Sequence, residues 1–253
     1  MLLTRVMPCL LMSRGALVKT INFKNPTYVG DPVNAVRIFN QKEVDELILF
    51  DVTASSEDTG IDIATIENVV GECFMPITYG GGVRSVEEMH RLYALGIEKI
   101  SLDTAALANP GLVREAADVF GSQSVVVTLD VKKSLFGKYT VRRNRGREDT
   151  KKLVGEVARN MQELGAGELV VNSIDRDGTW AGFDLELIRQ VASQVTVPVI
   201  AVGGAGTLAD LRAAVVQGGA AAVAIGSMAV FQGKDLGVLI KFPKPAEVAG
   251  LFD

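Results

Sequence analysis

Short apolar segments recur along the whole chain and constrain its fold more than any other feature of the sequence. Amphipathic segments separate most of them, beginning at Asp, Ser, Thr or Asn and carrying Gly near several ends, as helices do. Buried strands that alternate with helices are typical of parallel βα units. Eight such units in 253 residues predict an α/β fold, the (β/α)8 TIM barrel. The expected strands are 5–11, 46–52, 76–79, 99–102, 124–130, 168–173, 198–202 and 222–226.

The two halves of the sequence repeat each other at an offset of 122 residues. Such a repeat predicts two similar half-barrels related by a pseudo-twofold axis. Some self-similarity is also expected of any barrel, because strand, glycine turn and helix recur in it. Several features coincide at the one offset: Pro76 with Pro198, Gly81-Gly82 with Gly203-Gly204, Gly96 with Gly218, and Thr104-Ala105 with Gly226-Ser227.

No linker or break in composition divides the chain, so we expect one domain over residues 1–253. The net charge of -4 provides no positive field for a nucleic acid. No apolar run reaches membrane-spanning length, and the N-terminus lacks the pattern of a signal peptide. Cys9 and Cys73 lie in apolar surroundings, as reduced thiols do. We expect a cytoplasmic protein without a nucleic-acid or membrane partner.

Two glycine turns each follow a predicted strand and open a predicted helix. Their backbone N–H groups can approach an anion closely, and the helix N-terminus adds positive potential. Small residues at the next strand ends would complete two phosphate sites, which fits a small substrate with two phosphates. A tight connection is the simpler explanation for one such turn. The residues concerned are Gly81, Gly82 and Thr104 in one half, and Gly203, Gly204, Gly226 and Ser227 in the other.

Carboxylates follow several of the predicted strands. At the C-terminal rim of a barrel such a group can act as a general acid or base. Asp130 is the strongest candidate. Asp51 and Asp177 are also expected at the substrate, although a cap or salt bridge would explain Asp51 equally well. A loop cap is the favoured role of Asp175.

Other isolated residues are less informative. Lys19, in a long loop after the first strand, could reach a substrate phosphate or carbonyl or could be solvated. Trp180 could be a substrate platform or a loop anchor. The basic run 138–149 is expected to be a solvated loop or hairpin that could help to attract an anion. Because His90 is the only histidine and falls on a predicted outer helix, histidine triads and multi-histidine metal sites are excluded. No metal or cofactor is expected.

Four charged residues fall at the first positions of predicted strands: Arg5, Glu46, Lys99 and Glu168. They should therefore form a ring around the bottom of the barrel, with two charges of each sign. Salt bridging for stability is the ordinary explanation at that end of a barrel.

Several blocks of the sequence resemble the cyclase subunit of imidazole glycerol phosphate synthase, and the similarity extends over essentially the whole chain. The blocks include "MPCL", "DELILFDVTASSE", "GGGVRS", "FGSQSVVVTLD", "ELGAGELVVNSIDRDGT" and "PVIAVGGAG". The resemblance implies a two-phosphate substrate at the top of the barrel, with Asn172 among the residues that bind it. It also implies a heterodimer with a glutaminase docked at the bottom. The ring of four charges would then be a gate for ammonia, which travels inside the barrel to the top.

The chain departs from this family at positions that carry its chemistry. The family ends its first strand with an aspartate that works with the one after the fifth strand. Here the second survives as Asp130 but the first is Leu11, so the resemblance implies that cyclisation is crippled. Asp103 replaces an asparagine of the first phosphate site, where a carboxylate would repel phosphate. In the second site Val202 replaces a serine.

The ending "FQGKDLGVLIKFP" resembles a paralogous branch, the acetamidino modification proteins of surface-polysaccharide synthesis. That likeness implies a cyclase-like subunit that works with a dedicated glutaminase and a separate sugar amidotransferase. Two alternatives stay open. The chain could be a histidine-pathway cyclase that tolerates Leu11, or an inert scaffold that only activates the glutaminase.

Overall fold

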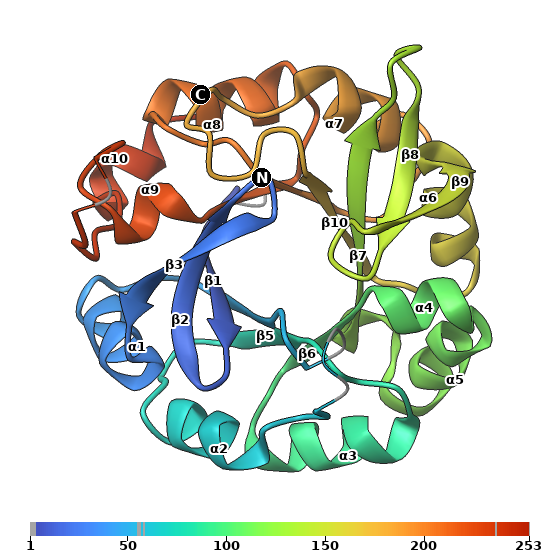
Figure 1. The fold of residues 1–253 in the computed structure, drawn as a ribbon, viewed down its shortest axis with the longest axis horizontal. Helices are drawn as coiled ribbons and strands as arrows, with labels where there is room; N and C mark the ends of the chain where they lie inside the picture. Colours follow the sequence, from blue (N-terminus) through green and yellow to red (C-terminus); the bar gives the residue numbers. More distant parts are fainter. Residues whose placement is uncertain (1–3, 55–56, 58, 236, 253) are drawn as a thin grey trace.

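The computed structural model describes residues 4–54, 57, 59–235 and 237–252. Ser55 and Ser56, which belong to the block "DELILFDVTASSE", lie outside this range. Eight parallel strands form a closed barrel, surrounded by helices (Figure 1). The predicted (β/α)8 barrel is therefore confirmed. Around the barrel the strands are β1 (Arg5–Ser13), β4 (Leu47–Asp51), β5 (Ile77–Gly80), β6 (Lys99–Leu102), β7 (Val125–Lys133), β10 (Glu168–Ser173), β11 (Val199–Val202) and β12 (Ala222–Ile225).

Polar residues start most of the outer helices, as the sequence predicts. The side chains of Asp31, Asp62, Ser85, Asp184 and Thr207 each accept a hydrogen bond from the backbone three residues later. These caps satisfy N–H groups that a helix leaves free at its first turn. The helices are α1 (Pro32–Gln41), α2 (Ile63–Gly71), α3 (Val86–Leu95), α4 (Thr104–Ala108), α5 (Gly111–Phe120), α6 (Val154–Glu163), α7 (Leu185–Ala192) and α8 (Leu208–Val216).

The last βα unit has no long helix within the described residues. Two short helices, α9 (Ser227–Val230) and α10 (Pro245–Ala249), flank an irregular segment. Phe242 of this segment packs edge-on against Phe39 of α1, with 6.4 Å between ring centroids. The C-terminal segment thus fills the remaining place in the outer ring. None of the described helices is long and apolar enough to cross a membrane.

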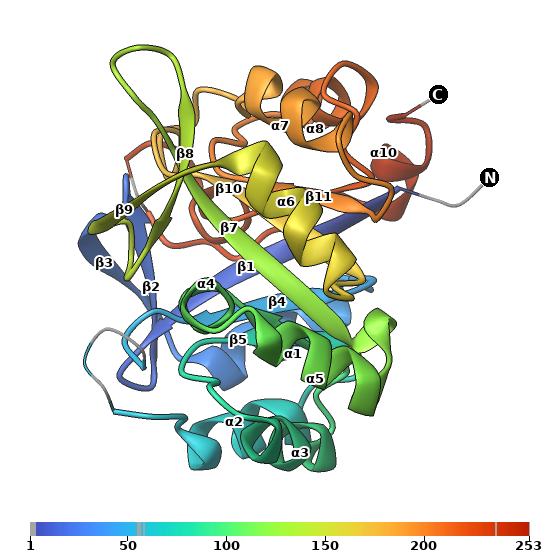
Figure 2. The same ribbon diagram turned by 90° about the vertical axis from the view of Figure 1, so that its right-hand side faces the viewer.

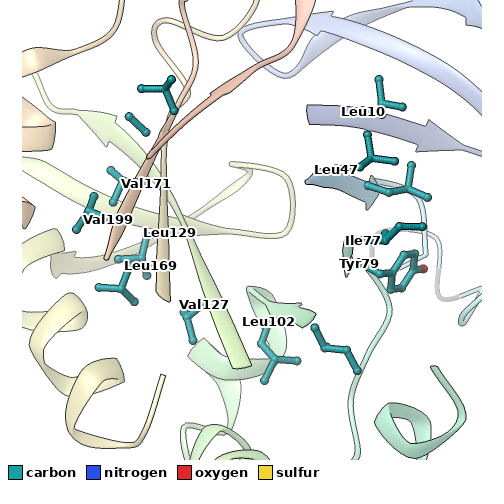
Figure 3. Packing of buried hydrophobic residues seen from close by; sticks show 14 of the residues in the cluster. Leu10, Leu47, Ile77, Tyr79, Leu102, Val127, Leu129, Leu169, Val171 and Val199 are labelled. Atoms are coloured by element: carbon teal, nitrogen blue, oxygen red, sulfur yellow. The ribbon is translucent and has the colours of Figure 1, made fainter. Parts of the chain in front are cut away.

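Both faces of the barrel strands are buried. Side chains such as Leu10, Leu47 and Leu102 point outward and pack beneath the helices (Figure 3). Alternate residues, among them Met7 and Ile48, form a second cluster inside the barrel. Burial on both faces explains why the strands appear as continuous apolar runs in the sequence.

Two strands of the barrel continue into antiparallel strands that the apolar pattern did not reveal. After β1 come β2 (Ala16–Ile21) and β3 (Lys24–Gly30), and after β7 come β8 (Tyr139–Arg143) and β9 (Glu148–Leu153). The β7–β8 hairpin projects beyond the barrel (Figure 2). Because β1 and β7 each begin one half-barrel, matching extensions agree with the predicted pseudo-twofold repeat. The basic run 138–149 forms β8 and the start of β9, which confirms the hairpin alternative.

Candidate functional site

The C-terminal ends of the barrel strands surround a cavity of about 1250 Å³, a volume that includes its open mouth. This is the end at which enzymes of this fold carry their active sites. The structure brings together at this cavity every residue that the sequence placed at the top of the barrel. These are Lys19, Asp51, Gly81, Gly82, Asp103, Thr104, Asp130, Asn172, Asp177, Gly203, Gly204, Gly226 and Ser227.

Glycine is required at both predicted turns because the chain passes close to neighbouring backbone. Gly81 has a φ of 124°, and a Cβ on it would lie 2.3 Å from the carbonyl oxygen of Asp51. Gly203, its partner in the repeat, has a φ of 95°, and a Cβ on it would lie 2.8 Å from the carbonyl oxygen of Ser173. A side chain at either position would be strained and would clash. The two turns therefore share one geometry in the two halves.

The next strand ends are also related by the repeat, but with a shift of one residue. Thr104 and Ser227 each begin a short helix, α4 and α9. Their preceding residues, Asp103 and Gly226, share an unusual backbone conformation with ψ of -93°. The sequence alignment of Thr104 with Gly226 is thus wrong by one position, because the structural partner of Thr104 is Ser227. Asp103 puts a carboxyl group where the other half has only the hydrogen of Gly226.

Two carboxyl groups lie at the cavity on neighbouring strands. Asp130 belongs to β7 and accepts a hydrogen bond of 3.0 Å from Nδ2 of Asn172. Burial and the charge of Asp177 raise the pKa of Asp130 to about 7, although the bond from Asn172 opposes this. Burial and the charge of Asp130 raise the pKa of Asp103 well above its ordinary value, although hydrogen bonds to Thr104 oppose this. A carboxyl group with such a pKa can hold a proton near neutral pH and give it to a substrate.

Two buried oxygens close to this pair have no hydrogen-bond partner within the described structure, namely Oδ1 of Asp103 and Oδ1 of Asn172. Buried polar atoms in folded proteins are almost always paired. Unpaired acceptors that border an open cavity are therefore available to the N–H or O–H groups of a ligand.

Lys19 is not in a loop. It lies in β2 with a side chain that is only 6% exposed, so the solvated alternative is wrong. Its Nζ donates a hydrogen bond to the carbonyl oxygen of Cys9 and lies 2.9 Å from where a Cβ on Gly226 would be. Burial lowers the pKa of Lys19, although Cys9 and Asp177 oppose this effect. The position places a donor beside the second predicted anion site.

The other carboxylates have local partners. Oδ1 of Asp51 accepts bonds from the backbone N–H groups of Thr53 (2.9 Å) and Ala54 (3.0 Å), so it caps its own turn while lining the cavity. Asp177 accepts a bond of 2.7 Å from the hydroxyl of Thr20, and burial raises its pKa. Asp175 accepts from the backbone N–H of Lys133 at 2.9 Å, in agreement with a loop cap.

Two further residues of the cavity come from segments whose role the sequence left open. Arg145, in the turn between β8 and β9, lines the wall and brings a positive charge from the basic run. Trp180 also lines it and has Lys241 near its ring, 5.9 Å from the centroid. The Trp180 ring thus both borders the cavity and anchors its loop. His90 is exposed on α3 and packs on Phe120, 4.6 Å between ring centroids, as expected for an outer helix.

The four charges at the bottom of the barrel form a closed ring in which opposite signs alternate. Arg5 contacts Glu46 and Glu168 at 2.6 Å each. Lys99 contacts the same two carboxylates at 3.0 and 3.1 Å. The hydroxyl of Thr78 also donates to Glu46 at 3.0 Å. Burial would raise the pKa of Glu46, but Lys99 and Arg5 outweigh it and lower the pKa.

Between the ring and the cavity, the inside of the barrel is polar on one side and apolar on the other. Thr78, Ser101 and Thr128 supply hydroxyls from neighbouring strands, and the oxygens of Ser101 and Thr128 lie 2.7 Å apart. The opposite side carries residues such as Met7 and Ile200. A small polar molecule that entered through the ring would find hydrogen-bond partners along its way to the cavity.

Leu11 lies near the C-terminal end of β1 and gives this part of the strand an apolar side chain. It lines the cavity and packs, together with Phe50, on the apolar cluster inside the barrel. Leucine can neither give nor take a proton. The wall of the cavity formed by β1 therefore supplies no acid or base at this position.

Known proteins show clear similarity over most of this chain. The sequence model of the histidine biosynthesis protein family matches residues 5–235. A Pseudomonas aeruginosa protein provisionally named imidazole glycerol phosphate synthase subunit hisF2 is 51% identical over 239 residues, covering 94% of this chain and 95% of its own. A protein of Leptospira interrogans with the corresponding provisional name is 43% identical over the full length of both chains. Imidazole glycerol phosphate synthase subunit HisF of Alkaliphilus metalliredigens is 40% identical over 90% of each chain.

Proposed function

The chain belongs to the histidine biosynthesis protein family, and on this basis we propose that it is a cyclase-type subunit that receives ammonia from a glutaminase. The observation that carries the proposal is the closed ring of Arg5, Glu46, Lys99 and Glu168 at one end of a barrel whose cavity opens at the other. The glutaminase would dock at the bottom to form a heterodimer in the cytoplasm. Ammonia would pass the ring and follow the hydroxyls of the interior to the cavity.

The chemistry at the top is proposed to be an amidation rather than the ring closure of the histidine pathway. Leu11 removes one proton-transfer group from the cavity wall, and Asp103 places a carboxyl group beside the first anion site. Both changes disfavour a substrate with two phosphates that needs acid and base on opposite walls. We propose that ammonia is used on a nucleotide-linked N-acetyl sugar, whose acetamido group becomes an acetamidino group, with a separate sugar amidotransferase as third partner.

Asp130 is the proposed acid or base of the site. The substrate phosphate of the sugar nucleotide would bind at the second anion site, beside Lys19. Gly203, Gly204, Gly226 and Ser227 form this site, while Gly81, Gly82 and Thr104 form its counterpart in the other half. Lys19 favours an anion there because its Nζ is a buried hydrogen-bond donor beside Gly226.

A histidine-pathway cyclase remains the second candidate, since the relatives' names favour it. An inert scaffold that only activates a glutaminase is the third. The cavity with its unpaired acceptors favours a ligand-binding protein over a scaffold. The substrate that is turned over, an N-acetyl sugar nucleotide or the substrate of the histidine pathway, separates the first two candidates. Coupling of glutamine hydrolysis to product formation separates both of them from an inert scaffold.

Replacing Lys99 by methionine is expected to uncouple glutamine hydrolysis from amidation. The substitution keeps the apolar stem but removes the charge that closes the ring between Glu46 and Glu168. Transfer of ¹⁵N from labelled glutamine, per glutamine hydrolysed, should fall by about tenfold in the complex with its glutaminase, as a change of ~1.4 kcal/mol would produce. With ammonium chloride as nitrogen source, turnover should be unchanged.

The exposed Lys152→Met variant serves as the matched control and should couple like wild type. Unchanged coupling in Lys99→Met would refute a gate made by the ring. Absence of glutaminase binding to the wild-type chain would refute the proposed function as a whole.

A further inference from the structure

Asp103 and Asp130 line the same wall of the cavity, at the ends of neighbouring strands. Strands β6 and β7 pair in parallel, with Leu102 opposite Val127. This register places Asp103 level with Thr128, two residues before Asp130. Two residues earlier on each strand, Ser101 and Thr128 touch through their hydroxyls, so inward side chains of the two strands are in contact. The two carboxyl groups therefore belong to one continuous row of polar residues.

Among the described residues, no lysine or arginine forms an ion pair with Asp103 or Asp130. The side-chain bond to Asp130 comes from the amide of Asn172, and Oδ1 of Asp103 is buried without a partner. Two neighbouring buried carboxyl groups without a counter-ion cannot both ionise easily, because their charges repel each other in a weakly polar surrounding.

A structural role does not account for the carboxyl group of Asp103. It is hydrogen-bonded locally to Thr104, the first residue of α4, but makes no side-chain cap with that helix. The repeat-related residue Gly226 reaches a similar backbone conformation with no side chain at all. The fold therefore does not need a carboxyl group at this place, which points to a role toward a ligand.

We propose that Asp103 and Asp130 share one proton and act together as the acid and base of the reaction in the cavity. The proposal deepens the proposed function and rests on it only for the identity of the reaction. The carboxylic acid gives its proton to one substrate atom, and the carboxylate takes a proton from another. The pair holds one proton before and after: the carboxylate takes a proton from ammonia as its nitrogen bonds to the acetamido carbon, and the carboxylic acid protonates the acetamido oxygen, which leaves as water after a second such exchange. Asn172 is the positioning residue, since its amide holds one oxygen of Asp130.

The groups that face the pair determine its titration. Asp177 adds negative charge from the loop after β10, and Asp51 lies at the end of β4. Lys19 of β2, Arg145 from the turn after β8 and the thiol of Cys9 on β1 complete the set around the same cavity. These groups influence the pH at which the pair titrates. Each variant is therefore compared with wild type, and all of the surrounding groups stay in place.

The pair is tested by the titration of ¹³Cγ-labelled aspartate in the purified chain, from about pH 3 to pH 9. In wild type, two coupled steps are expected, with one at unusually high pH. Both Asp103→Asn and Asp130→Asn should lower the pH of the highest step, because the remaining carboxyl group loses its charged neighbour although it stays buried. Asp118→Asn, an exposed residue on α5, is the control and should leave both steps in place. A highest step at an unchanged pH in either cavity variant would overturn the shared proton.

Thermal melts show whether the variants are folded and give a second readout. A carboxyl group whose pKa is raised by folding stabilises the protein at low pH, and this stability is lost as the pH rises through the folded pKa. Asp103→Asn removes that loss. Its melting temperature should exceed that of wild type by about 2–4 °C at pH 8 and should match it at about pH 3, below the unfolded pKa of an aspartate. An equal or lower melting temperature at pH 8 would contradict a charge penalty at Asp103.

The acid/base role of the pair is tested by measuring turnover of a nucleotide-linked N-acetyl sugar, with ammonium chloride as the nitrogen source. Asp103→Asn and Asp130→Asn should each lower turnover by about 100-fold or more and alter its pH profile. Unchanged turnover in Asp103→Asn would overturn the catalytic role. If the two titrations behave as expected but wild type gives no amidated sugar, the proton-sharing pair stands, the proposed function fails, and the acid/base role fails with it.

Discussion

With saturating ammonium and the substrate of the histidine-pathway cyclase, wild type is expected to turn over about 10²- to 10⁴-fold more slowly than its Leu11→Asp variant, the usual effect of one general acid or base. The reason is the place of the two residues in the barrel. Leu11 belongs to β1 and Asp130 to β7, which is four strands away in a barrel of eight. Residues so placed lie on opposite walls, where they can hold a substrate between an acid and a base.

Asp103 does not replace the missing group for that reaction. It follows β6, the direct neighbour of β7, so its carboxyl group lies on the same wall as Asp130. A pair on one wall exchanges protons with one side of a substrate only. The loss of ring closure and a new acid/base pair are therefore compatible.

Variants at both positions make the comparison decisive. Leu11→Asn has nearly the shape of Leu11→Asp but no proton to transfer, so it should remain as slow as wild type. The double variant Leu11→Asp with Asp103→Asn also removes the carboxyl group beside the first anion site, and it should exceed Leu11→Asp because a dianionic phosphate is no longer repelled. Wild-type turnover close to that of Leu11→Asp would show that the chain is a working cyclase. No turnover by any variant would show that the anion sites themselves serve another ligand.

The barrel could be predicted because the information for it is local. Each barrel strand is a short apolar run and most outer helices begin at a capping residue, so both can be recognised without knowing what they contact. The ring of four charges could be predicted for the same reason. Once the strands are placed, Arg5, Glu46, Lys99 and Glu168 fall at one end of the barrel, and the structure brings them into contact.

The details that could not be predicted depend on contacts between distant segments. Lys19 seemed free to be solvated because β2 lacks a marked apolar pattern, yet pairing with β1 buries it. The equivalence of Asp103 and Gly226 appears only in their backbone angles, since the sequence repeat aligns Thr104 with Gly226 instead. The pairing of Asp103 with Asp130 requires the register of β6 and β7, which the sequence does not specify.

Replacing Glu46 by alanine is expected to lower the free energy of unfolding by about 2–4 kcal/mol, somewhat less than for a fully buried ion pair because Arg5 and Lys99 are partly exposed. Glu46 is 4% exposed and contacts Arg5, Lys99 and Thr78. Its removal leaves two cations that share Glu168 and repel each other. Urea unfolding at neutral pH measures the change.

The pH dependence of this effect follows from the lowered pKa of Glu46. A carboxylate with a lowered pKa stabilises the fold above its unfolded pKa, and the contribution is lost as the pH falls through the folded pKa. The difference between wild type and Glu46→Ala should therefore shrink below about pH 4, the ordinary range of a glutamate. The surface pair of Arg37 and Glu72 provides the matched control, because an ion pair in contact with solvent stabilises little and Glu72→Ala should cost much less than Glu46→Ala. Equal losses from Glu46→Ala and Glu72→Ala would show that the ring stabilises no more than a surface ion pair, and a role in passage rather than in stability would then be the remaining reason for its regular arrangement.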